Sequence, residues 1–207
     1  MYTHNFEYKT TGTPAASAKG ALVMIHGRGG TAANIVSLSR ELNVPDFAIY
    51  APVATNNSWY PYSFMAPDAQ NQPALNSSLE SIGKLVEQIK ADGIPAEKIY
   101  FLGFSQGACL TLEYITHNAQ QFGGAVAFTG GLIGEHLNPS HYNGNFNATP
   151  VLITTGNPDP HVPLSRVEES VEILKQHGAE VTLKVFPGKP HTITIDEIEL
   201  ANQFIFA

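Results

Sequence analysis

The sequence predicts an α/β fold, in which helices cover both faces of a mostly parallel central sheet. Short apolar runs alternate with stretches of helical periodicity along most of the chain, which is the pattern of strands joined by helical crossovers. Most helical stretches have the roughly 10–15 residues typical of right-handed crossovers between parallel strands. The length of 207 residues fits one domain, and no repeat or low-complexity stretch interrupts it. We therefore expect residues 1–207 to form a single domain.

The first half of the chain predicts two strands and two helices. Ala21–His26 (ALVMIH) is a continuous apolar run that ends at a glycine, as a buried strand of a parallel sheet does. Thr31–Asn43 has an apolar stripe at helical spacing, and Phe47–Val53 predicts the second strand. The long helix expected at Leu75–Ala91 places these apolar residues on one face: Leu75, Leu79, Ile82, Leu85, Val86 and Ile89.

The second half repeats the alternation. Lys98–Phe104 (KIYFLGF) predicts a third strand, and Gln106–Asn118 predicts a helix directly after it. Gly124–Thr129 and Val151–Thr155 are short apolar runs that predict two more strands. The last three elements are a helix, a strand and a helix. The first helix, Pro163–His177, ends before Gly178, and an alternating strand follows at Val181–Phe186. The final helix is expected at Ile193–Ile205.

Two longer irregular stretches, Ala54–Pro73 and Gly130–Thr149, interrupt this alternation. Sheets of this kind bind ligands beyond the carboxyl ends of their strands, so we expect both stretches to lie over that edge. The first stretch carries a cluster of large apolar residues that would wall an acyl or alcohol pocket, or else form a hydrophobic flap packed on the core. The residues proposed for this wall are Trp59, Tyr60, Phe64 and Met65.

Composition excludes several classes of function. The chain has 11 Lys and Arg against 18 Asp and Glu, a net charge of −7, with no basic run, so nucleic acid and anionic membranes are poor partners. The single cysteine, Cys109, excludes an intrachain disulfide and a cysteine-rich metal site. No apolar run approaches the roughly 18 residues of a membrane-spanning helix. The segment Met1–Lys9 lacks a signal-peptide pattern, so we expect a cytoplasmic protein without integral membrane association.

The segment Gly103–Gly107 (GFSQG) has the pattern Gly-x-Ser-x-Gly at the junction of an expected strand and helix. A serine on such a sharp turn takes a strained backbone conformation that lifts its hydroxyl clear of the sheet. Neighbouring backbone comes so close that the positions two residues before and after it must be glycine. An ordinary strand-to-helix turn is the alternative. The pattern predicts Ser105 as a nucleophile, which needs a base and then an acid to orient that base.

The base and the acid are expected in loops at the same edge of the sheet. His191 directly follows the last strand, in Gly188–His191 (GKPH), and His161 is its rival in the loop after Val151–Thr155. Asp159 lies between two prolines in that same loop, and its alternative role is that of a turn aspartate. The order Ser, Asp, His is the one expected for this chemistry. We therefore predict Ser105, Asp159 and His191 as a catalytic triad.

Acyl transfer also needs two backbone N–H donors for the negative charge that develops on the carbonyl oxygen. The residue after the nucleophile, Gln106, would supply one donor. The glycine-rich loop His26–Gly30 (HGRGG) follows the first central strand, and Arg28 is our choice there for the second donor. Such a loop alone could cradle a phosphate, but the spacing of a dinucleotide site and a Walker lysine are both missing. No His-x-x-x-His or clustered carboxylates indicate a metal site.

Together these segments resemble the phospholipase/carboxylesterase family of α/β-hydrolases, a small group without a cap domain that includes acyl-protein thioesterases. The resemblance covers nearly the whole chain, and it rests on four segments. They are His26–Gly30, Gly103–Gly107, the run from Gly156 through Asp159 to Val162-Pro163, and Gly188–His191. The resemblance implies the α/β-hydrolase fold without a large cap and hydrolysis of esters or thioesters without a cofactor. It also implies the triad and donors named above, and often a homodimer.

Some positions differ from the thioesterase branch of that family. That branch usually carries an apolar residue at position 28, an acidic one at 30 and a histidine at 155, where this chain has Arg28, Gly30 and Thr155. The loop and the Trp59–Met65 stretch look more like bacterial carboxylesterases. We therefore expect a serine carboxylesterase that acts on small to medium carboxylic esters through an acyl-enzyme. The alternatives are a lysophospholipase or acyl thioesterase and, from another class, a non-catalytic binding protein with the hydrolase fold.

Overall fold

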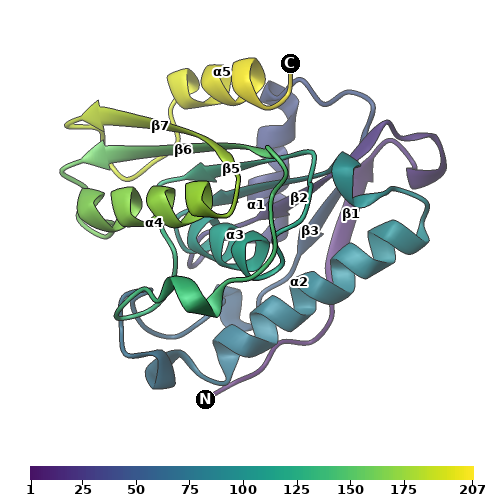
Figure 1. Ribbon diagram of the computed structural model, residues 1–207. Coiled ribbons are helices and arrows are strands. Elements are labelled where there is room, and N and C mark those ends of the chain that lie inside the picture. The colour runs from purple at the N-terminus through teal and green to yellow at the C-terminus, as the bar shows by residue number, and fades with distance from the viewer.

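Seven strands form a single sheet in the order β1-β3-β2-β4-β5-β6-β7 (Figure 1). The computed structural model describes all residues from 1 to 207. β1 is antiparallel to β3, and every other neighbouring pair of strands is parallel. The strands are β1 (Tyr8–Gly12), β2 (Gly20–Ile25), β3 (Phe47–Pro52), β4 (Ile99–Phe104), β5 (Gly124–Phe128), β6 (Pro150–Asn157) and β7 (Glu180–Pro187).

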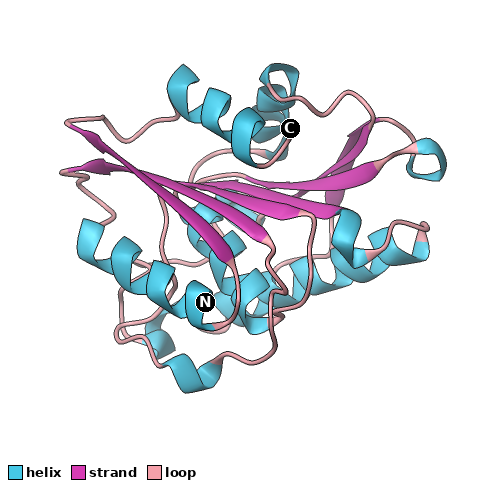
Figure 2. Ribbon diagram, turned by 45° about the horizontal axis from the view of Figure 1, so that its top comes forward, coloured by secondary structure: helices cyan, strands magenta, loops and turns pink.

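Helices cover both faces of this twisted sheet, as Figure 2 shows. The helices are α1 (Ala32–Ser37), α2 (Ala74–Ala91), α3 (Gln106–His117), α4 (Leu164–Gln176) and α5 (Ile195–Phe204). Apolar residues of α2, α3 and α4 share one core cluster, and those of α1 and α5 share the other. The continuous apolar run of β2 follows from this arrangement, because Val23 belongs to the first cluster and its neighbour Met24 to the second. None of the α-helices combines the length and apolar character needed to cross a membrane.

The expected strands and helices are confirmed in order, with two differences. The sequence does not predict β1, because this edge strand has no apolar run and is mostly exposed. It joins the sheet through its pairing with β3. The expected helix Thr31–Asn43 is wrong in its second half, since the α-helix ends at Ser37 and a 3-10 turn, Leu38–Glu41, follows. The chain leaves helical geometry there because Leu42 and Val44 turn into the core.

The loops after β2, β4, β6 and β7 leave the sheet at the same edge, because these strands are parallel. No large cap covers this edge, and the architecture is the α/β-hydrolase fold. Of the two irregular stretches, only residues 54–73 line the cavity at this edge. Residues 130–149 are instead held beside α3 and α4, where Arg166 donates to the carbonyls of Leu132 and Gly134.

Candidate active site

Ser105 lies on the sharp turn between β4 and α3. Its backbone has φ 53° and ψ −117°, in the left-handed region that residues with a side chain rarely adopt, at a cost of about 1–3 kcal/mol. A Cβ at Gly103 would collide with the backbone of Gly107, and a Cβ at Gly107 would collide with the carbonyl of Ile25. These close approaches explain why glycine flanks the serine, and the local pattern predicted this turn correctly.

His191 connects Ser105 to Asp159, which are far apart in the sequence. Its Nε2 lies 2.8 Å from Ser105 Oγ, and its Nδ1 lies 2.8 Å from Asp159 Oδ2. Asp159 comes from the loop after β6, and His191 comes from the loop between β7 and α5. The side chain of Asp159 is completely buried, whereas that of His191 is 18% exposed. The structure thus brings together the three residues that the sequence predicts as a triad.

Asp159 is held in its ionised form. Burial by itself raises the pKa of this carboxyl, but the hydrogen bonds from His191 and from the backbone N–H groups of His161 and Val162 lower it more. The net pKa therefore lies below the ordinary value. An ionised Asp159 accepts the Nδ1 proton of His191, which leaves the lone pair of Nε2 facing the Ser105 hydroxyl.

A buried ion pair holds the loop between β7 and α5 that carries His191. Lys189 Nζ lies 3.2 Å from Glu197 Oε1, and the two side chains are 4% and 0% exposed. The same Nζ donates to the carbonyl of Thr192 at 2.7 Å, so Lys189 also binds its own loop. Glu197 accepts from the backbone N–H and hydroxyl of Thr194 at the start of α5. The Thr194–Glu197 spacing is a helix-capping pattern visible in the sequence, but nothing in the sequence indicated the ion pair.

Two backbone N–H groups beside Ser105 have no acceptor within the protein. Gln106 is the first residue of α3, and its N–H has no partner upstream in the helix. In the loop after β2, the N–H groups of Gly29 and Gly30 bind the carbonyls of Asn57 and Gly27, whereas that of Arg28 is unbonded. A Cβ on Gly27 would approach Phe104 and Ser105 to 3.2–3.4 Å, so this glycine allows the loop to lie against the turn.

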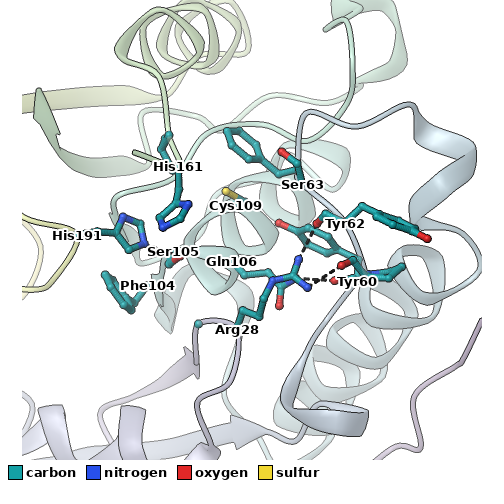
Figure 3. A pocket seen from close by; sticks show the side chains of 14 residues that line it. Arg28, Tyr60, Tyr62, Ser63, Phe104, Ser105, Gln106, Cys109, His161 and His191 are labelled. Atoms are coloured by element: carbon teal, nitrogen blue, oxygen red, sulfur yellow. Dashed lines mark hydrogen bonds between the residues drawn. The ribbon is translucent and has the colours of Figure 1, made fainter. Parts of the chain in front are cut away.

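The side chains of Arg28 and Gln106 hold residues 58–64, which we call the flap. Arg28 donates to the carbonyls of Pro61 at 2.8 Å and Tyr62 at 2.6 Å (Figure 3). The amide of Gln106 accepts from the N–H of Trp59 at 2.9 Å and donates to the carbonyl of Tyr60 at 2.8 Å. The sequence predicts a role for the backbone N–H groups of both residues alone. No local sequence signal shows that their side chains fix the flap.

A cavity of about 530 Å³ opens in front of Ser105 (Figure 3). Of the four residues predicted for its wall, Tyr60 and Phe64 line it and Trp59 and Met65 do not. Trp59 is completely buried, and its indole N–H donates to the carbonyl of His26 at 2.8 Å. Lining residues that the sequence analysis did not assign to the site are Gly27, Pro61, Tyr62, Ser63, Phe104, Cys109 and Val162.

His161 and Cys109 line the cavity without belonging to the hydrogen-bonded triad. His161 is exposed, and its ring centroid lies 4.9 Å from that of His191 in an edge-to-face arrangement. No side-chain hydrogen bond joins its ring to Ser105 or Asp159, so it occupies the position of a pocket residue. Burial raises the pKa of the Cys109 thiol to about 12. The thiol is therefore protonated at neutral pH and is a poor nucleophile.

A serine on a strained strand-to-helix turn, bonded to a histidine that an aspartate holds, is the arrangement of a serine hydrolase with the α/β-hydrolase fold. The comparisons with known proteins agree with this class. The chain belongs to the phospholipase/carboxylesterase family, whose model matches residues 7–207.

Three relatives illustrate the similarity. The crystal structure of a phospholipase/carboxylesterase from Dyadobacter fermentans is 62% identical, has a TM-score of 0.99, and covers 100% of this chain and 99% of its own. Acyl-protein thioesterase 1 from Debaryomyces hansenii is 30% identical over 92% of each chain. The Bacillus cereus carboxylesterase structure is 18% identical, covers 95% of this chain and 92% of its own, and has a TM-score of 0.78, which shows a shared fold.

Proposed function

We propose that this enzyme is a carboxylesterase that hydrolyses small to medium carboxylic esters through an acyl-enzyme. Ser105 is the nucleophile, His191 the general base, and Asp159 the acid that orients it. The observation that carries the proposal is the pair of 2.8 Å contacts that His191 makes with the other two side chains. Tyr60, Phe64 and Val162 line a cavity of about 530 Å³. This cavity suits the acyl group of a small to medium ester.

In the acylation step, His191 Nε2 takes the hydroxyl proton as Ser105 Oγ bonds to the ester carbonyl carbon. The electron pair of the C=O double bond moves to the oxygen, which becomes an oxyanion. The N–H groups of Arg28 and Gln106 donate to it, and one such donor contributes about 2.7–4 kcal/mol of transition-state stabilisation. When the intermediate collapses, the bond to the alcohol oxygen breaks and that oxygen takes the proton from His191.

Deacylation repeats these steps with water. His191 removes a proton from a water molecule that attacks the acyl carbon, and the same two N–H groups bind the second oxyanion. The bond to Ser105 Oγ then breaks, Oγ regains a proton from His191, and the carboxylic acid leaves. Throughout both steps the ionised Asp159 balances the positive charge of the imidazolium.

Labelling with a fluorophosphonate probe tests this assignment. The wild type should bind one equivalent of probe, with mass spectrometry placing it on Ser105. Ser105→Ala should bind none and should lose about 10⁶-fold in kcat on a p-nitrophenyl ester. Ser165→Ala changes an exposed serine and is the matched control. Unchanged labelling or turnover in Ser105→Ala would refute the assignment, and an unlabelled wild type would favour a non-catalytic binding protein.

A second candidate activity, acyl thioester or lysophospholipid hydrolysis, uses the same chemistry. It is favoured by the similarity to an acyl-protein thioesterase over 92% of this chain. Rates on p-nitrophenyl esters of increasing acyl length, on the matching thioesters and on lysolipids separate the two. The carboxylesterase proposal expects the highest kcat/KM at short to medium acyl lengths. A steady increase to long chains, or faster thioester turnover, would replace it with the second candidate.

A further inference from the structure

The cavity in front of Ser105 has a different charge character from the rest of the molecule. The chain carries a net charge of −7, yet neither aspartate nor glutamate lines this cavity. Arg28 is the one residue in its lining that always carries a charge. The N-terminus of α3, a helix of 12 residues, begins at the same place and contributes further positive potential. The local field therefore favours negative charge on a bound molecule.

Arg28 supplies a cationic group whose charge no protein carboxylate balances. It takes part in no salt bridge. Its guanidinium makes three hydrogen bonds, all to neutral oxygens, namely two flap carbonyls and the Ser58 hydroxyl. A guanidinium has five N–H donors, so two remain for a ligand. The flap contacts also fix the orientation of the group, which lowers the entropic cost of binding an anion.

Asp159 and Glu113, two carboxylates that act on cavity-lining residues, are already engaged. Asp159 lies behind His191 and accepts from that ring and from two backbone N–H groups. Glu113 is buried and accepts from His117, Tyr142 and the N–H of Ile133.

Figure 3 shows His161 and His191 on one side of the cavity and Arg28 with Tyr60 and Tyr62 on the other. A molecule bound to Ser105 would thus extend past His161 on one side or toward Arg28 on the other.

We propose that the preferred substrates are half-esters of small dicarboxylic acids, with the free carboxylate bound by the Arg28 guanidinium. This inference rests on the proposed function, because it names the substrate class of the same site. A carboxylate is the ligand that the planar fork of arginine binds best, and a charge-assisted hydrogen bond is about twice as strong as a neutral one. The rival explanation is that the Arg28 side chain only holds the flap, while its backbone N–H donates to the oxyanion.

A pair of matched substrates distinguishes these explanations. Monomethyl glutarate carries a carboxylate where methyl 5-oxohexanoate, of nearly the same shape, carries a methyl ketone. The readout is the ratio of their kcat/KM values, measured by following acid release. The wild type should prefer the half-ester by about fivefold to tenfold. The preference should shrink in 1 M salt, because an exposed charge interaction is screened.

Three variants complete the test. Arg28→Met should bring the ratio to about one, whereas Arg28→Lys, which keeps the charge but loses the planar fork, should keep part of the preference. Arg40→Met removes one positive charge from an exposed arginine that does not line this cavity, and it should leave the ratio unchanged. Loss of flap contacts alone would lower kcat/KM for both substrates equally, so the ratio isolates the effect of the charge.

The outcomes separate this inference from the proposed function. A wild-type ratio at or below one, or an Arg28→Met variant that keeps the full preference, would overturn the inference. Either result leaves the proposed function standing if both esters are hydrolysed and Ser105→Ala hydrolyses neither. Turnover of both esters by Ser105→Ala would instead overturn the proposed function, whatever the ratio is.

Discussion

The two sides of the cavity are built by different physical means. On one side, the turn at Ser105 follows from backbone sterics, because adjacent segments come too close for any side chain at Gly103 or Gly107. On the other side, the flap is held by the side chains of Arg28 and Gln106, which bind its backbone 33–47 residues away in the sequence. The proposed nucleophile is therefore fixed by backbone packing, while the proposed substrate wall depends on a few replaceable side-chain contacts.

The largest effect should come from the catalytic side. Asp159→Asn keeps the shape of the side chain but removes the charge that orients His191, so kcat should fall by about 10⁴-fold with little change in KM. Steady-state kinetics on a p-nitrophenyl ester checks this. Asp46→Asn, which alters an exposed aspartate in a surface ion pair, is the control and should retain wild-type kcat. A decrease of less than tenfold in Asp159→Asn would show that the base does not depend on this carboxylate.

Asp159→Asn should also change how the free energy of unfolding depends on pH in the acid range. The pKa of Asp159 is lower in the folded than in the unfolded protein, so its ionised form stabilises the fold above the unfolded pKa of about 3.9. That stabilisation disappears as the pH falls through the folded pKa. Urea unfolding at several pH values between 2 and 6 should therefore show a weaker loss of stability on acidification in Asp159→Asn than in the wild type. Identical pH dependence in the two proteins would contradict this linkage.

The buried ion pair between Lys189 and Glu197, which holds the loop of His191, should give the next largest effect. Lys189→Met leaves the completely buried Glu197 without its cation and should cost about 3–5 kcal/mol of unfolding free energy. Adding Glu197→Gln removes the second charge while keeping an acceptor for Thr194, so the double variant should regain most of that loss. Urea unfolding measures both effects. If the double variant is no more stable than Lys189→Met, the cost does not come from an unpaired buried charge.

Gly107→Ala tests whether sterics fix the turn. The new Cβ would collide with the carbonyl of Ile25, so we expect a loss of about 3 kcal/mol, toward the upper end of what overpacking costs. Gly83→Ala is the matched control, because it lies inside α2 and the nearest atom to its new Cβ is 3.8 Å away. That change should stabilise the protein by about 0.5–1 kcal/mol. Equal thermal stability of the two variants would refute the steric explanation.

This contrast also explains what the sequence could predict. The turn at Ser105 is marked by a local pattern, with Gly103 and Gly107 on either side. The order of the strands then places the loops of Asp159 and His191 at the same edge of the sheet. The approach of these three residues could therefore be predicted. Trp59 and Tyr60 are adjacent and both aromatic, but only Tyr60 lines the cavity. Which of the two faces the cavity depends on the path of an irregular loop. That path depends in turn on the contacts that Arg28 and Gln106 make with it. Long-range side-chain contacts of this kind, like the pairing of Lys189 with Glu197, leave no periodic signal.

The smallest effect should come from the flap side. Gln106→Ala keeps the backbone N–H proposed for the oxyanion but leaves the buried N–H of Trp59 without its acceptor, which should cost about 1–3 kcal/mol of stability. Because the flap then loosens, KM should rise by more than kcat falls. Gln121→Ala changes an exposed glutamine of the same size and should alter neither quantity. A decrease in kcat at constant KM would instead mean that the Gln106 side chain acts on the reacting atoms, and the two sides of the cavity would no longer be separable.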